Sequence, residues 1–254
     1  MLRHRNEYPV EGSVPGSAFD GATTWLNSPP LTPQELRGRV VLVNFGTYTC
    51  INWIRSLPYV RAWADKYAGT GLAVVGVNTP EFEFEGNLEN VERALQEMAV
   101  RHPVAVDNDY AVWQAFDNHY WPALYFVDAE GQIRHHHFGE GEYEESEMVL
   151  QMLLGAAGAE IDQGLVEIVP QGVEQQADWY SLGSAETYLG YGQACGFASP
   201  AGVYFDEPHA YSAPAQLRRN QWALTGNWQV GSVPVLLTEP GGSRSSSTPV
   251  VSTW

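Results

Sequence analysis

The sequence predicts an α/β sandwich with a mixed β-sheet over residues 1–158, followed by a small β-rich module. Three observations predict this architecture. Short apolar runs of strand length alternate with segments of helical spacing as far as residue 156. A turn signal near the end of this region, Asp128-Ala129-Glu130-Gly131, indicates a hairpin that adds an antiparallel strand. Beyond residue 158, short alternating segments broken by Gly and Pro replace the helical pattern.

The elements of the first region follow from the spacing of apolar residues. Residues 1–36 are rich in Pro, Gly and Ser, which favours a loop that ends in a short helical turn. The first strand after it is a β-branched apolar run of the length of a buried strand. The expected strands are 39–45, 72–78, 104–106, 123–128 and 132–138. The expected helices are 50–67, 87–101, 108–118 and 142–156.

The last hundred residues differ in texture. Residues 159–240 contain short alternating segments, such as 165–169 and 221–224, and are expected to form the β-rich module. Residues 241–254 are rich in Gly and Ser and are expected to be a flexible tail. The predicted division is therefore 1–158, 159–240 and 241–254.

The charge of the chain excludes several classes of partner. The 254 residues include 30 acidic and 13 basic side chains, with a formal net charge of -17. Proteins that bind a phosphate backbone carry a basic surface instead. Nucleic acid and anionic membranes are therefore poor candidate partners.

No apolar run approaches the ~20 residues of a membrane-spanning helix. The N-terminal residues lack the apolar stretch of a signal peptide. We therefore expect a cytoplasmic location, or an extracytoplasmic one if the chain is part of a longer protein. The two cysteines, Cys50 and Cys195, are too few and too distant for a disulfide scaffold or a zinc site.

Cys50 is the strongest candidate for chemistry. It follows a predicted buried strand and begins a predicted helix, so its sulfur should face the positive end of the helix dipole. Such a position favours the thiolate and makes the cysteine a nucleophile near neutral pH. The alternative is that Cys50 is a small buried hydrophobic residue without a chemical role.

The segment 36–50 resembles the entry strand and active-site turn of the redoxins of the thioredoxin superfamily, which include AhpC/TSA and TlpA/ResA-like proteins. It is most similar to the TlpA/ResA-like branch and to the soluble C-terminal half of DipZ-type proteins. The likeness covers about residues 16–155. Further motifs carry it in order: Val77-Asn78-Thr79-Pro80-Glu81, Pro103-Val104-Ala105-Val106-Asp107, Trp121-Pro122 and the hairpin at Gly131. The resemblance implies a thioredoxin-like three-layer sandwich and thiol-based redox chemistry, for which we expect neither cofactor nor metal.

The resemblance also implies roles for individual residues. Cys50 would be the attacking thiolate, and Pro122 would be a cis-proline that presents the backbone of Trp121 to a thiol or disulfide substrate. Gly139 would line the substrate groove, and Glu81 would tune the acidity of the cysteine. The alternative for Pro122 is an ordinary trans-proline that begins a strand. The alternative for Glu81 is a solvated loop carboxylate.

The departures from the family pattern concern the release step. The usual Cys-x-x-Cys pair is replaced by Cys50-Ile51-Asn52-Trp53, so the resolving cysteine is absent and Trp53 would close the site. Gly46 replaces a usual tryptophan, and Asn44 stands where many thioredoxins have a buried aspartate. Release of a mixed disulfide normally needs a second thiol, so we expect an external thiol to supply it.

Two other functions remain open. A one-cysteine thiol peroxidase is favoured by Thr47, three residues before Cys50, although Val43 replaces the proline of the peroxiredoxin motif. A redox-silent binding module would keep the fold as a scaffold. The expected partners are a thiol or disulfide protein or a small thiol reductant, with peroxide as an alternative.

Three remaining features are weaker. Cys195 would resolve a mixed disulfide only if the second module folded back onto the first. His135 and His137 would share one strand face, but they lack an evident third metal ligand. The C-terminal module resembles the carbohydrate-binding-like, jelly-roll domain of DipZ-type proteins in incomplete form, through Glu186-Thr187-Tyr188-Leu189-Gly190-Tyr191 and Phe197-Ala198-Ser199-Pro200. Exposed Trp222 or Trp228 would then stack on a glycan, whereas in a small β fold they are more often core residues.

Overall fold

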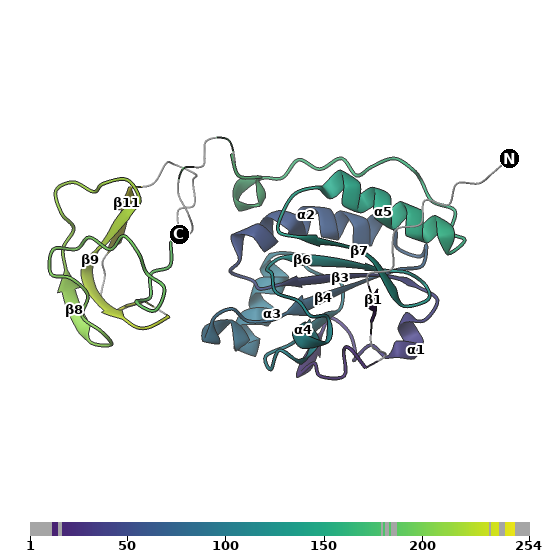
Figure 1. Ribbon diagram of the computed structural model, residues 1–254, viewed down its shortest axis with the longest axis horizontal. Coiled ribbons are helices and arrows are strands. Elements are labelled where there is room, and N and C mark those ends of the chain that lie inside the picture. Colours follow the sequence, from purple (N-terminus) through teal and green to yellow (C-terminus); the bar gives the residue numbers. More distant parts are fainter. Residues whose placement is uncertain are drawn as a thin grey trace. The chain divides into compact units, whose positions relative to one another are not determined.

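The structure is a computed structural model that describes residues 12–14, 17–178, 180, 183, 187–233, 235–238 and 242–246. The chain divides into two compact units, Met1–Gln176 and Ala177–Trp254. Each unit has its own sheet (Figure 1). No helix in the described part of the chain has the length and apolar character required to cross a membrane.

The first unit is built on a seven-stranded mixed sheet with the strand order β1-β7-β6-β3-β4-β5-β2. The pairs β3–β4 and β4–β5 are parallel, whereas β6 is antiparallel to both β3 and β7. This arrangement confirms the predicted α/β fold with a mixed sheet. The strands are β1 (Gly12–Ser13), β2 (Thr24–Leu26), β3 (Val40–Gly46), β4 (Leu72–Asn78), β5 (Val104–Val106), β6 (Ala123–Val127) and β7 (Gln132–Phe138).

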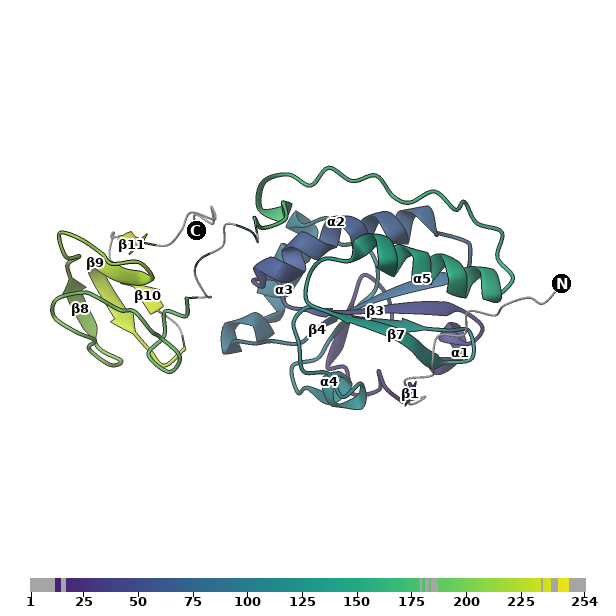
Figure 2. The same cartoon turned by 45° about the horizontal axis from the view of Figure 1, so that its top comes forward.

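Helices cover both faces of this sheet, which gives three layers (Figure 2). Alternate residues of β3 point to opposite faces: Val40 and Leu42 pack against α2 and α5, and Val43 and Phe45 pack on the side of α4. Because both faces are covered, every residue of β3 is buried. The helical segments are α1 (Pro33–Leu36), α2 (Ile51–Lys66), η1 (Glu83–Gly86), α3 (Leu88–Glu97), α4 (Ala111–Ala115), α5 (Tyr143–Ala156) and η2 (Gly172–Glu174).

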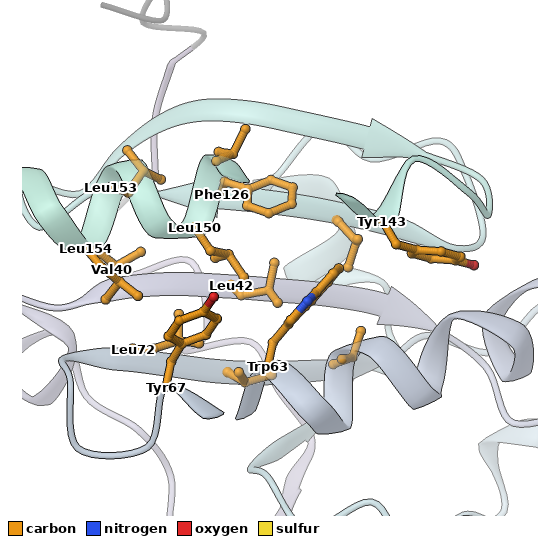
Figure 3. Close-up of a cluster of buried hydrophobic side chains, with 14 residues drawn as sticks. Val40, Leu42, Trp63, Tyr67, Leu72, Phe126, Tyr143, Leu150, Leu153 and Leu154 are labelled. Carbon is orange, nitrogen blue, oxygen red and sulfur yellow. The ribbon is translucent and has the colours of Figure 1, made fainter. Parts of the chain in front are cut away.

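The core between the sheet and the helices α2 and α5 anchors the site. Trp63 of α2 and Leu150 of α5 meet over Leu42 of β3 (Figure 3), and none of the three side chains is exposed to solvent. Truncation of a buried side chain of this size typically costs about 3–5 kcal/mol for Trp and about 2–5 kcal/mol for Leu. The helix that begins after Cys50 is therefore held firmly against the sheet.

One edge of the sheet gathers the turn that contains Cys50 and four further loops. The strands β3, β4 and β5 end at this edge, β6 begins there, and β7 ends there, because β6 runs opposite to its neighbours. The loops at this edge are 47–50, 79–87, 107–110, 117–122 and 139–142. We call it the Cys50 edge.

Residues 159–176 belong to the first unit. Segment 165–169, expected to be an alternating β segment, forms no strand. Its apolar residue Val166 packs against the core of the first unit, and the Val166 backbone N–H donates to Glu147 Oε2 at 2.8 Å. A side chain thus replaces the strand partner that this segment would need. The predicted boundary at residue 158 stays a prediction.

The second unit is a small antiparallel sheet around one long strand, β9 (Gln221–Val230). Three strands pair with it: β8 (Pro208–Tyr211), β10 (Val235–Leu237) and β11 (Gly242–Ser246). Its small core includes Trp222 and Leu224. The strand β11 lies in the region that the sequence suggested as a flexible tail. Residue Glu186 of the quoted motif and residues 247–254 lie outside the described residues.

Candidate active site around Cys50

Cys50 lies between β3 and α2, at the N-cap position of the helix. Its backbone N–H donates to Thr47 O at 3.1 Å, and its carbonyl accepts from Ile54 N at 3.0 Å. The cysteine is partly buried and packs against apolar residues of α2 and α3. The first backbone N–H groups of a helix have no partner within the helix, and the dipole is positive there. The local geometry therefore suits an anion on this residue.

The three departures from the family pattern form one packed unit. Trp53 is only 5% exposed, and its indole Nε1 donates to Asn44 Oδ1 at 2.5 Å. A Cβ atom on Gly46 would lie 2.0 Å from Trp53 Cδ1, which is far closer than any real contact. The indole thus occupies the space above Gly46, and only glycine leaves room for it.

The packing of Trp53 against Asn44 limits the chemistry available close to Cys50. Neither the indole of Trp53 nor the amide of Asn44 titrates near neutral pH, and neither is a nucleophile. The indole N–H of Trp53 is satisfied by Asn44 Oδ1, whereas the buried Asn44 Nδ2 has no hydrogen-bond partner among the described residues. The place three residues after Cys50 therefore offers neither a second thiol nor a proton acceptor.

The loop before β6 faces the same edge. The peptide bond between Trp121 and Pro122 is cis. Phe45 of β3 is paired with Ala123 of β6, so Pro122 lies beside the end of β3 from which the turn to Cys50 starts. Gly139 donates its backbone N–H to Pro122 O at 2.9 Å. The structure thus brings Pro122 and Gly139 into direct contact.

Trp121 links the loop 117–122 to the loop 79–87. Its indole Nε1 donates to Thr79 O at 2.9 Å, and its ring lies 4.2 Å from the ring of Trp113. Gly139 has a positive φ of 90°, which a residue with a side chain rarely adopts. These contacts fix the backbone that the sequence predicts to face a substrate.

The loop 79–87 contains a residue that the sequence reasoning missed. Glu81, the predicted tuning residue, is partly buried, whereas Glu85 is 0% exposed. Glu85 Oε2 accepts from the backbone N–H groups of Glu81 at 2.7 Å and Phe82 at 2.8 Å. Its Oε1 accepts from the hydroxyl of Thr49, the residue before Cys50. The sequence shows three glutamates at alternate positions in this loop, and nothing in the pattern marks the last as buried.

Thr47 lies beneath the turn rather than on its surface. The side chain is 0% exposed, and its Oγ1 atom has no hydrogen-bond partner in the part of the chain that the structure describes. Its carbonyl caps the turn by accepting from Cys50 N. Thr47 therefore shapes the turn through its backbone.

The Cys50 edge is acidic. Its five loops contain neither Lys nor Arg. Arg55 of α2 forms a 3.0 Å ion pair with Glu140. Burial raises the pKa of Glu140, and the hydrogen bond from Arg55 opposes this rise. The carboxylates in the five loops are Glu81, Glu83, Glu85, Asp107, Asp109, Asp117, Glu140 and Glu142.

The outer two histidines of the run on β7 lie on one face of the strand. His135 is paired with Phe126 and His137 with Leu124, so these two share one face, as predicted from the alternation of a strand. His137 Nδ1 lies 3.2 Å from Glu142 Oε2. Among the residues with described positions, no group of three His, Cys, Asp or Glu side chains could hold a metal ion.

In the second unit, Cys195 is exposed, and its carbonyl accepts from the Trp222 indole at 2.8 Å. Trp222 is 3% exposed and belongs to the core of this unit, so its ring is not available to stack on a sugar. Trp228 is partly buried, and its Nε1 donates to Thr225 O at 2.9 Å. The two tryptophans thus support the core role rather than the glycan role.

Comparisons with known families agree with this fold. The family described as Redoxin matches residues 15–152. The family described as thioredoxin-like C-terminal domain matches residues 184–245. The first match spans the Cys50 edge with all of its loops.

Two relatives with similar sequences support the same family. Protein DipZ of Mycobacterium tuberculosis (strain CDC 1551 / Oshkosh) is 38% identical over 220 residues, which cover 84% of this chain and 31% of DipZ. The chain thus spans about a third of the length of that relative. Thiol-disulfide oxidoreductase YkuV of Bacillus subtilis (strain 168) is 31% identical over 125 residues, covering 49% of this chain and 84% of YkuV.

Among solved structures, the solution structure of a thioredoxin-like protein in its oxidised form is similar. It is 30% identical, with a TM-score of 0.51, and the match covers 59% of this chain and 97% of that one. Fold, family matches and relatives therefore agree. The chain belongs to the redoxin family, among the thioredoxin-like thiol-disulfide oxidoreductases.

Proposed function

We propose that the protein exchanges disulfides through one active-site cysteine, Cys50, and holds its substrate as a mixed disulfide until an external thiol releases it. The observation that carries this proposal is the Trp53 indole, which is bonded to Asn44 and fills the space above Gly46. Family membership supports the thiol chemistry. The packing explains why this chain would stop halfway through the usual cycle.

In the first step, the Cys50 thiolate attacks one sulfur of a disulfide. A bond forms between Cys50 Sγ and that sulfur, the original S–S bond breaks, and the second sulfur leaves as a thiolate. The helix N-terminus at Cys50 favours the attacking anion. We assign positioning of the substrate to the backbone at Trp121 and Pro122, together with Gly139, which contacts Pro122.

The second step needs another thiolate to attack the mixed disulfide at Cys50. The α2 side chain at the resolving position is Trp53, which cannot attack. Asn44, its hydrogen-bond partner, cannot accept a proton as an aspartate would. An external protein or small-molecule thiol therefore completes the exchange, and in its absence the adduct persists. Glu81 stays our candidate for tuning the acidity of Cys50.

Disulfide exchange has better support than a one-cysteine peroxidase. In a peroxidase, the hydroxyl three residues before the cysteine would bind the peroxide. The Thr47 hydroxyl of this chain is fully buried. The comparisons match thiol-disulfide oxidoreductases.

The test is to form and release the adduct in a Cys195→Ser background, so that only Cys50 reacts. Incubation of the native protein with hydroxyethyl disulfide should add one mercaptoethanol, detected by intact mass spectrometry. The adduct should persist after the reagent is removed and disappear when dithiothreitol is added. A Cys50→Ser variant serves as the control and should gain no mass.

The Trp53→Cys variant tests the reason for persistence, since it restores a thiol three residues after Cys50. It should release mercaptoethanol without added reductant. Failure of Cys50 to form an adduct in the folded protein would overturn the proposed function. Spontaneous release from the chain that keeps Trp53 would overturn the proposed mechanism.

A further inference from the structure

Glu85 is a buried carboxylate that the proposed exchange mechanism does not use. It is 0% exposed and lies in η1, after β4. Both of its oxygens are engaged: Oε2 by the backbone N–H groups of Glu81 and Phe82, and Oε1 by the Thr49 hydroxyl. Glu85 thus has three hydrogen-bond partners, two on Oε2 and one on Oε1.

The loop 79–87 connects the separate parts of the Cys50 edge. The cis-proline loop reaches it through Trp121 Nε1, which donates to Thr79 O at 2.9 Å. The 107–110 loop reaches it through Asn108 Nδ2, which donates to Gly86 O at 2.9 Å. The turn before Cys50 reaches it through Glu85 and through Tyr48, whose hydroxyl donates to Phe84 O at 3.3 Å.

We propose that Glu85 is a positioning residue of the Cys50 site, which holds the turn before the nucleophile through the Thr49 hydroxyl. Thr49 directly precedes the N-cap residue of α2. The bond to Glu85 therefore fixes the orientation of the turn from which the Cys50 sulfur projects. The inference rests on the proposed function, because it assumes that Cys50 is the reacting group.

The position of Glu85 gives it an electrostatic effect that a neutral clamp would lack. A negative charge beside the turn disfavours a second negative charge on Cys50 and opposes the helix N-terminus. Burial raises the pKa of Tyr48, and the charge of Glu85 adds to this rise. Burial likewise raises the pKa of Tyr110, and the charge of Glu85 adds to that rise.

Other titratable groups lie on the elements around Cys50, and the test must separate Glu85 from them. The turn itself contributes Tyr48, and α3 contributes Arg93, which is bonded to Asn90 at 2.6 Å. The remaining groups on the surrounding loops are Glu81, Glu83, Asp107, Asp109, Tyr110, Asp117, His119, Tyr120, Glu140 and Glu142. Glu83 is the matched control, because it is exposed and lies in the same η1 turn as Glu85.

The test measures the rate of Cys50 alkylation by iodoacetamide against pH, in a Cys195→Ser background. Glu85→Gln removes the charge and should lower the midpoint by about half a pH unit or more. Thr49→Val leaves the charge of Glu85 but removes the hydroxyl that donates to it. The less compensated charge should then raise the midpoint of the Cys50 alkylation rate. Thr49→Ser restores the hydroxyl and should return the native midpoint. Glu83→Gln should shift it by less than about 0.2 units, because solvent screens this exposed charge.

The opposite signs separate this role from simple loosening of the turn, which would move both variants in the same direction. Shifts of equal sign for Glu85→Gln and Thr49→Val would overturn the inference, as would shifts no larger than that of Glu83→Gln. If Glu85→Gln does not fold, judged by circular dichroism, the Thr49→Val and Thr49→Ser pair decides. An unchanged midpoint in Thr49→Val, or a displaced midpoint in Thr49→Ser, would then overturn the inference. A native midpoint at or above ~8.5 would instead contradict the proposed function, and the difference between variants would still be measurable.

Discussion

The substitution Gly46→Ala tests whether Gly46, Trp53 and Asn44 form one unit. The added Cβ would lie 2.0 Å from Trp53 Cδ1, 2.3 Å from Nε1 and 2.4 Å from Cγ. These are atoms of a rigid ring that is 5% exposed, so the whole indole must move. Its 2.5 Å hydrogen bond to Asn44 would break as a result.

The cost has two parts. Overpacking of a well-packed core typically costs about 1–3 kcal/mol, and leaving a buried hydrogen-bonding group unsatisfied costs about 1–3 kcal/mol. We therefore expect Gly46→Ala to lower the free energy of unfolding by about 2–6 kcal/mol. In a Trp53→Leu background the indole is absent, and the same change should cost less than about 1 kcal/mol.

The assay is urea unfolding of the native protein, the two single variants and the double variant, monitored by circular dichroism. The double-mutant cycle should give a coupling free energy of at least about 1 kcal/mol between positions 46 and 53. Gly155→Ala is the matched control, because nothing lies within 4 Å of its added Cβ. Equal costs of Gly46→Ala in the two backgrounds would refute the packing account.

Two further predictions concern pH and charge. Burial, with the charge of Arg61 second, lowers the pKa of His102 to about 4. The folded state therefore resists a proton that the unfolded state accepts, and the free energy of unfolding should fall by about 3 kcal/mol between pH 6.5 and 4. His102→Gln should remove that share in urea unfolding at several pH values; an unchanged pH profile would contradict the assignment. At the acidic Cys50 edge, a cationic methanethiosulfonate should modify Cys50 about tenfold faster than an anionic one at ~10 mM salt. The two rates should converge at ~1 M salt, whereas a faster anionic reagent would show that the helix N-terminus dominates.

The sequence predicted the long elements of the first unit because their apolar spacing is strong. The strands β4 (Leu72–Asn78) and β7 (Gln132–Phe138) have the expected bounds. The strands β1 and β2 were not predicted, since two or three residues carry no measurable period. The strand β2 exists because it pairs with β5 at the edge of the sheet. Such strands depend on a partner rather than on their own composition.

The candidate site shows the same limit. The sequence predicts Cys50 as the reactive residue and shows the changes at Asn44, Gly46 and Trp53 only as separate departures from a family pattern. Their contact became evident only with coordinates, because the ring of Trp53 folds back over residues in the preceding strand. Glu85 was missed for a related reason, since its burial depends on Thr49 from a distant part of the chain.

The central claim is that Cys50 is an activated nucleophile in a site without a resolving group. The most direct measurement is the alkylation rate of Cys50 against pH in the otherwise native chain with Cys195→Ser. We predict a midpoint clearly below the ~8.5 of an ordinary cysteine, because the thiolate lies at the start of α2. A midpoint at or above ~8.5 in the folded protein would contradict the account and favour a redox-silent scaffold.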